Sequence, residues 1–166
     1  IYMNLTFQGK SVRLSGSPLK VGDAVPNFTV INNAMDTVSL KDTNGVRIFL
    51  TVPSIDTPVC DLETRTFNEK TSEIPGVTVY TVSMDLPFAQ SRWCAANGIK
   101  NVITVSDFKD RTFGKNFGTY MEDLGLLART AFVVNSTNKI TYVEYVPEVT
   151  NQPNFDAILN AAKKAK

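Results

Sequence analysis

The sequence has no histidine and only two cysteines, Cys60 and Cys94. Without histidine, imidazole can act neither as a metal ligand nor as a catalytic base, so a cysteine hydrolase would have no base beside its thiol. Two thiols far apart in the chain are too few for a thiolate zinc site or for a disulfide scaffold. We therefore expect no metal and no cofactor, and the two cysteines become the candidates for chemistry.

The sequence also lacks long hydrophobic runs and any marked bias in charge. No stretch approaches the roughly 20 apolar residues that span a bilayer, and residues 1–20 lack the apolar segment of a signal peptide. Met3 is a candidate native start. The net charge of +1, without a basic face interleaved with aromatics, argues against nucleic-acid binding. We expect a cytoplasmic protein that binds neither membrane nor nucleic acid, in a reducing compartment where a cysteine pair is more often redox-active than structural.

The order of predicted elements indicates an α/β fold in one domain, residues 1–166. Two apolar runs rich in β-branched residues, 46–52 and 77–82, are typical of strands buried on both faces of a sheet. Helical patterns follow each of them, from Pro58 to about residue 70 and over 87–96. Further strands are expected over 4–7 and 11–14 (a hairpin extension within 1–15), 28–31, 37–40, 102–105, 131–135 and 140–145, and further helices over 111–117 and 155–165. This order predicts a sheet covered on both faces.

Cys60 lies at the predicted start of a helix, shortly after a buried strand. Thr57 is a good N-cap, and Pro58 fits the first helical position, where a missing N–H costs nothing. Cys60 then takes the third helical position, where an anion meets free backbone N–H groups and the positive end of the helix dipole. This position favours the thiolate, the nucleophilic form of cysteine. The dipole alone contributes under about 1 kcal/mol, so we expect a second cation, Arg or Lys, nearby. The alternative, an inert buried cysteine, is disfavoured by the polar flanks.

Cys94 lies inside the helix predicted over 87–96, with Asp85 as the expected N-cap and Gly98 as the expected stop. Taken alone, Cys94 fits a buried structural cysteine next to Trp93. Taken with Cys60, it is a candidate partner, because a cysteine oxidised to sulfenic acid needs a second thiol to form a disulfide. A disulfide requires Cα atoms within about 4.4–6.8 Å, and two helix-borne cysteines rarely lie so close. We therefore expect at least one helix to unwind locally when the bond forms.

PSIDTPVC, residues 53–60, has the pattern of Pro, three residues, Thr, two residues, Cys. This pattern resembles that of the peroxiredoxin family. DLPFAQSRWC, residues 85–94, is similar to the resolving-cysteine helix of the bacterial thiol peroxidases, the atypical two-cysteine branch of the family. FQGKSV (7–12), NVITVSDF (101–108) and LLARTAFVV (126–134) also resemble that branch, so the resemblance covers nearly the whole chain.

The resemblance implies a thioredoxin-like fold, with a central mixed β-sheet flanked by helices and an added N-terminal β-hairpin. It implies that Cys60 is the peroxidatic cysteine, which attacks hydrogen peroxide or an organic hydroperoxide and becomes a sulfenic acid. Cys94 would resolve this acid as an intramolecular disulfide, which thioredoxin reduces. By the same resemblance, Thr57 would hydrogen-bond the thiolate and the peroxide, Pro53 would shield the pocket from water, and Arg129 would be the active-site arginine. The resemblance also implies a homodimer.

Arg129 fits the role of the expected cation on physical grounds as well. The fixed fork of a guanidinium can favour a thiolate and orient the oxygens of a peroxide. The alternative, a surface arginine at a strand end, is disfavoured by the apolar residues on both sides of Arg129. Arg65 is the main rival for the role, and Arg92 and Arg111 are weaker candidates.

Two other hypotheses use the same residues. The cysteine pair could belong to a non-enzymatic redox sensor or chaperone, which reacts once per reduction and passes a conformational change to a partner. The chain could also be a thioredoxin-like binding module with two inert cysteines. The absence of a Cys-x-x-Cys motif separates it from thioredoxin-type reductases. Sequence separates a peroxidase from a sensor poorly, because both would use the same residues. Turnover distinguishes them, because a sensor reacts only once per reduction.

Overall fold

The computed structural model describes residues 4–165, so the expectation that Met3 is the native start lies outside the described residues. The strands are β1 (Leu5–Phe7), β2 (Lys10–Val12), β3 (Thr29–Ile31), β4 (Thr37–Ser39), β5 (Val46–Thr51), β6 (Val77–Ser83), β7 (Val102–Ser106), β8 (Tyr120–Met121), β9 (Leu126–Leu127), β10 (Thr130–Val134) and β11 (Ile140–Tyr145). The helices are α1 (Pro58–Lys70), α2 (Pro87–Asn97), α3 (Thr112–Asn116) and α4 (Phe155–Lys164), with short 3-10 turns η1 (Leu40–Asp42) and η2 (Thr71–Glu73).

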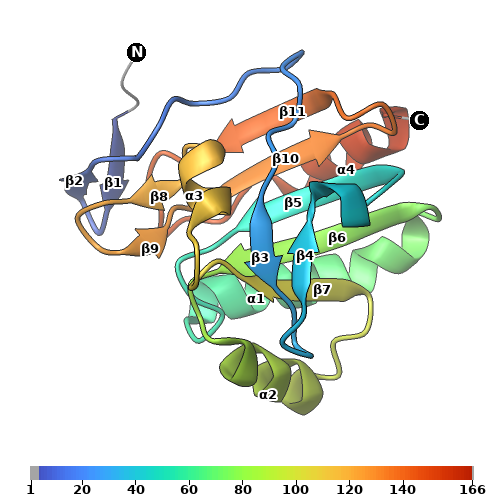
Figure 1. Ribbon diagram of the computed structural model, residues 1–166, viewed down its shortest axis with the longest axis horizontal. Coiled ribbons are helices and arrows are strands. Elements are labelled where there is room, and N and C mark those ends of the chain that lie inside the picture. The colour runs from blue at the N-terminus through green and yellow to red at the C-terminus, as the bar shows by residue number, and fades with distance from the viewer. Residues whose placement is uncertain (1–3, 166) are drawn as a thin grey trace.

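Seven strands form one mixed sheet in the order β11-β10-β5-β6-β7-β3-β4 (Figure 1). The three central strands β5, β6 and β7 run parallel, and the strands on either side of them pair antiparallel. β1 and β2 form a separate N-terminal hairpin. These features confirm the predicted central mixed sheet and added hairpin. The small ladder of β8 and β9 was not predicted, since strands of two residues leave no periodic pattern.

Both faces of the sheet are covered, as the continuous apolar runs predict. All six residues of β5 are buried. Ile48 and Leu50 belong to a core cluster that includes residues of α1 and α4, whereas Phe49 points the other way, into a cluster rich in aromatic rings. That second cluster includes Phe113 of α3. Figure 1 shows α3 in front of the sheet and α1 and α4 behind it. Burial on both faces is why this strand reads as an unbroken hydrophobic segment.

The pairing of β10 with β5 determines where the ends of these strands meet. The two strands are antiparallel, with Thr130 opposite Thr51. The start of β10 therefore lies beside the end of β5, where the chain continues into the loop that leads to α1. The hydroxyl of Thr51 donates to the carbonyl of Ala128 at 2.7 Å, which holds the segment before β10 against this loop. Residues far apart in the sequence are thus brought to one end of the sheet.

The helix starts agree with the sequence analysis at α1 but not at α2. The hydroxyl of Thr57 accepts the N–H of Cys60 as the N-cap of α1, with Pro58 in the first turn. For α2, the prediction of Asp85 as N-cap is wrong: the N-cap is Leu86, which makes no side-chain cap. The carboxylate of Asp85 instead accepts hydrogen bonds from the loop before α1. Gly98 ends α2 in the left-handed conformation, at φ +62°, as predicted. Within residues 4–165, no helix combines the length and apolar character needed to cross a membrane.

Candidate functional site

Cys60 is completely buried at the amino end of α1, with 0% of its surface exposed. It packs in a small apolar cluster with Val52 and Ile55, and the half-buried Trp93 of α2 lies against that cluster. Its backbone N–H reaches the Thr57 hydroxyl at 3.3 Å. The thiol therefore sits where the helix dipole and an apolar wall act together. Burial excludes water, and in a water-poor site the charges near the sulfur have a larger effect.

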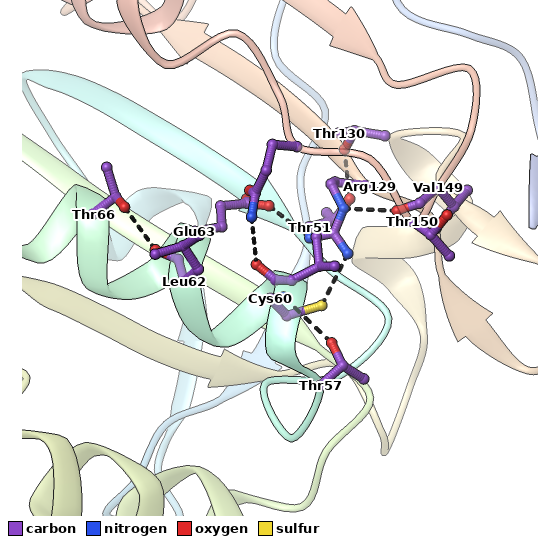
Figure 2. A network of polar contacts seen from close by, with 12 residues as sticks. Thr51, Thr57, Cys60, Leu62, Glu63, Thr66, Arg129, Thr130, Val149 and Thr150 are labelled. Carbon is purple, nitrogen blue, oxygen red and sulfur yellow. Dashed lines mark hydrogen bonds and ion pairs between the residues drawn. The ribbon is translucent and has the colours of Figure 1, made fainter.

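Arg129 is the cation at this sulfur. Its side chain is 2% exposed, and its Nη2 lies 3.1 Å from Sγ of Cys60. The same guanidinium donates from Nη1 to Oε1 of Glu63 at 2.6 Å and from Nε to the carbonyl of Val149 at 2.7 Å. Figure 2 shows Arg129 between these three partners, which come from α1 and from the segment after β11. With three nitrogens engaged, the direction of the fork toward Cys60 is fixed.

The electrostatics of the pair follow from its burial. Burial alone would lower the pKa of Arg129, but the carboxylate of Glu63 and the sulfur of Cys60 raise it above its ordinary value. Burial raises the pKa of Glu63 to about 7, although Arg129 opposes this shift. Among the described residues, Oε2 of Glu63 has no hydrogen-bond partner. The site thus keeps a permanent positive charge on Arg129, 3.1 Å from a thiol, an arrangement that favours thiolate chemistry.

Thr57 and Pro53 lie in the loop between β5 and α1. The Thr57 hydroxyl accepts from the N–H of Cys60 and donates to the carbonyl of Ser54 at 3.2 Å. It must rotate its proton away from Ser54 before it can donate to the sulfur or to a substrate. Pro53 is buried in the same loop. Both residues belong to the loop that leads into α1, beside the end of the sheet where Cys60 and Arg129 meet.

Cys94 lies on α2 and is not part of the apolar cluster around Cys60. It is half-buried, and its Sγ contacts the hydroxyl of Thr104 on β7 at 3.3 Å. Its neighbour Trp93 is the residue that packs against the Cys60 cluster. Both cysteines are free thiols. Since α2 presents Trp93 rather than Cys94 to the site, a bond between the two sulfurs requires a local rearrangement.

A cavity of about 290 Å³ adjoins the Cys60 cluster. Ile55 and Trp93 line it and also pack around Cys60. Asp56, Asp85 and Arg92 supply charged groups to its wall. The cavity therefore joins apolar and charged surface next to the buried thiol. Among residues 4–165, no cluster of three or more His, Cys, Asp or Glu side chains could hold a metal ion.

The three rival arginines make other contacts. Arg65 pairs with Asp61 one helical turn away, on the surface of α1. Arg92 is exposed and lines the cavity described above. Arg111 adopts a left-handed conformation before α3, with its guanidinium 6.0 Å from the ring centre of Tyr120. Of the four arginines considered from the sequence, Arg129 is the one whose hydrogen bonds include the sulfur of Cys60.

Sequence reasoning missed Glu63 and misread Asp85. Glu63 lies between residues at helical spacing in α1, where a charged residue is normally solvent-facing, yet it is 0% exposed. The sequence signal that could have placed Glu63 in the site is its position three residues after Cys60, because residues three apart share a helix face. Asp85 was taken for a helix cap, although its carboxylate bonds to Ser54 and Ile55. No local pattern encodes that long-range contact.

Comparisons with known proteins agree with this geometry. The family model described as Redoxin matches residues 20–159. A thiol peroxidase of Clostridium acetobutylicum is 60% identical over 164 residues, which cover 99% of this chain and 100% of that protein. A thiol peroxidase of Bacillus subtilis is 51% identical, covering 96% of each chain. The crystal structure of a peroxiredoxin-like protein from Aquifex aeolicus superposes with a TM-score of 0.92 at 39% identity, covering 98% of this chain and 97% of that one. The predicted resemblance is thereby confirmed, and the chain belongs to the Redoxin family, among the thiol peroxidases.

Proposed function

We propose that the protein is a thiol-dependent peroxidase in which the thiolate of Cys60 is the nucleophile. Its sulfur bonds to one oxygen of hydrogen peroxide or an organic hydroperoxide while the O–O bond breaks. The second oxygen takes a proton and leaves as water or an alcohol. Cys60 is oxidised by two electrons to a sulfenic acid, and the peroxide is reduced by the same two electrons.

The single observation that carries this proposal is the 3.1 Å contact between Arg129 Nη2 and Cys60 Sγ in a buried site. A guanidinium there stabilises the thiolate before the reaction and the charge that develops on the leaving oxygen during it. Its remaining nitrogens are already held by Glu63 and Val149. The group therefore needs no reorganisation when the charge moves from sulfur to oxygen.

In this proposal Thr57 and Pro53 complete the pocket. The hydroxyl of Thr57 would turn from the carbonyl of Ser54 to donate to the thiolate and the peroxide. Pro53, which carries no N–H and is buried in the loop, would shield the reacting atoms from water. The cavity beside Ile55 and Trp93 offers room for the organic part of a hydroperoxide.

Cys94 would complete the cycle as the resolving cysteine. Its sulfur attacks the sulfur of the Cys60 sulfenic acid, the S–O bond breaks, and the hydroxyl leaves as water with the thiol proton of Cys94. Thioredoxin, a dithiol, would then reduce the Cys60–Cys94 disulfide and become oxidised itself. We further propose that the protein works in the cytoplasm, because that compartment supplies reduced thioredoxin. We also propose that it forms a homodimer, as the resemblance to the peroxiredoxin family implies.

The test is peroxide consumption coupled through thioredoxin and its reductase to NADPH oxidation. We expect turnover by the wild type, none by Cys60→Ser, and a single reaction per molecule by Cys94→Ser. If the wild type forms the disulfide but does not turn over with thioredoxin, the redox-sensor hypothesis is favoured over the peroxidase proposal. If neither cysteine reacts, both are inert and the peroxidase proposal is wrong.

A further inference from the structure

The carboxylate of Asp85 fixes the loop that precedes α1 and Cys60, although Asp85 is not one of the reacting groups. Oδ1 of Asp85 accepts the Ser54 hydroxyl at 2.6 Å, and Oδ2 accepts the backbone N–H of Ile55 at 2.9 Å. These donors belong to the loop between β5 and α1. Ile55 is 2% exposed and packs directly against Cys60. The position of the apolar wall around the thiol thus depends on a residue 30 positions further along the chain.

The same carboxylate connects this loop to the first turn of α2. Oδ2 of Asp85 also accepts the Ser83 hydroxyl at 2.7 Å, and that hydroxyl accepts from Nε2 of Gln90 at 2.9 Å. Gln90 is 0% exposed and donates again to the carbonyl of Val105 at 2.8 Å. A continuous set of hydrogen bonds therefore runs from the Cys60 loop, through the end of β6, to the first turn of α2.

The remainder of α2 is held much less firmly. Pro87 and Gln90 are its buried residues, and none of the residues 91–97 is buried. Cys94 lies in that second half, which ends at the left-handed Gly98. Segments with few buried contacts open at low free-energy cost. By contrast, α1 buries Cys60, Glu63, Thr64 and Phe67.

We propose that Asp85 is a positioning residue that keeps the Cys60 pocket assembled while the second half of α2 unwinds to deliver Cys94. This inference rests on the proposed peroxidase function. The carboxylate fixes Ser54 and Ile55 on one side and, through Ser83 and Gln90, the first turn of α2 on the other. Unwinding is then confined to the segment after Gln90. Cys94 gains freedom to move, and the reactive geometry of Cys60 is preserved.

The two steps are separable in a single turnover. Trp93 is the only tryptophan in the sequence and lies beside both cysteines, so its fluorescence reports each step. Mass spectrometry of quenched samples distinguishes thiol, sulfenic acid and disulfide. For Asp85→Asn we expect oxidation of Cys60 by hydrogen peroxide to slow on the order of tenfold, the size expected for losing hydrogen bonds to a charged group. Disulfide closure should stay within about twofold of the wild type, a change too small to reflect lost hydrogen bonds.

Two further variants serve as controls, one for the loss of a carboxylate and one for the unwinding of α2. Asp110→Asn makes the same chemical change at an exposed carboxylate that does not line this cavity and that accepts none of the hydrogen bonds found among residues 4–165. It should react like the wild type. Ala95→Gly weakens the exposed second half of α2 and should speed closure on the order of fivefold, with Cys60 oxidation unchanged.

Ser54→Ala supplies a second route to the same test. It should slow Cys60 oxidation in the same direction, and adding it to Asp85→Asn should slow the reaction no further, because the two residues share one contact. The proposal is overturned if Asp85→Asn oxidises Cys60 at the wild-type rate, if both steps slow equally, or if the two substitutions are additive. Should Asp85→Asn fail to fold, Ser54→Ala alone decides the matter. Failure of the proposed function itself would be seen separately, as a wild type that does not react with peroxide.

Discussion

The guanidinium of Arg129 lies 3.1 Å from the sulfur of Cys60, although the two residues are 69 positions apart. The contact arises from strand pairing, since β10 begins beside the end of β5 with Thr130 opposite Thr51. Cys60 follows β5 through a short loop, and Arg129 directly precedes β10. One antiparallel ladder therefore places the cation of the site against its thiol.

Replacing Arg129 by lysine should slow the reaction of Cys60 with hydrogen peroxide about a hundredfold, the cost of losing one well-placed donor in a buried site. Lysine keeps the charge but loses the fork that bridges Cys60, Glu63 and Val149. Stopped-flow kinetics at a fixed pH measure the change. Arg65→Lys is the control, because its pair with Asp61 is a surface contact, and it should react at the wild-type rate. A wild-type rate for Arg129→Lys would show that the contact plays no part in the chemistry.

Replacing Thr57 by valine should both destabilise the protein and slow peroxide reduction. The hydroxyl caps α1 by accepting the N–H of Cys60, and loss of an N-cap costs about 1 kcal/mol. Chemical denaturation measures the free energy of unfolding, and single-turnover kinetics measure the rate. Thr57→Ser retains the hydroxyl and should remain close to the wild type in both. If valine lowers stability alone, the hydroxyl caps the helix without contacting the peroxide.

Glu63 should make the stability of the protein depend on pH between about 4.5 and 7. Burial raises its pKa from 4.5 to about 7, so in this range the folded protein binds more protons than the unfolded chain. The contribution of Glu63 to stability is therefore fully present below pH 4.5 and is lost as the pH rises through 7, a loss of up to about 3 kcal/mol for a shift of this size. Denaturant unfolding at several pH values should show this decline in the wild type and a flatter profile in Glu63→Gln. Glu69→Gln, on the exposed side of the same helix, should retain the wild-type decline.

Glu148 should hold the N-terminal hairpin to the rest of the molecule. Its carboxylate accepts from the Thr6 hydroxyl, the N–H groups of Gln8 and Gly9, and both donors of Thr150. The hydroxyl and N–H of Thr150 and the N–H of Gly9 lower its pKa to about 2. The stabilisation is therefore present above pH 4.5 and is lost as the pH falls toward 2.

We expect Glu148→Gln to increase amide hydrogen exchange in residues 5–12 at neutral pH. Its denaturation midpoint should approach that of the wild type as the pH is lowered from 4.5 to 2. Glu122→Gln, whose carboxylate accepts from the Ser15 hydroxyl, is the control and should affect exchange less. Unchanged exchange of the hairpin in Glu148→Gln would mean that its backbone contacts with residues 147–149 are sufficient to hold it.

The local features of the site could be predicted because they depend on a few neighbouring residues. Thr57 and Pro58 specify a helix start through capping and a fixed φ angle, and Gly98 specifies a helix end through its freedom at positive φ. The apolar run of β5 identifies a strand buried on both faces. These rules locate Cys60 in the first turn of a helix whatever the rest of the chain does.

Other features were decided by the tertiary structure. Which arginine reaches Cys60 depends on the register of β10 against β5, and no local pattern in the sequence encodes that register. The burial of Glu63 depends on the presence of Arg129, because an unpaired carboxylate would not remain in the interior.

Asp85 binds Ser54 and Ile55 rather than capping α2 because the loop before α1 passes beside it. Cys94 faces Thr104 for a similar reason, the rotation of α2 against β7. By itself, the sequence determined the candidate cysteine and its helix start, since capping and dipole effects act within one turn. The partners of that cysteine come instead from strand pairing and helix packing between distant segments.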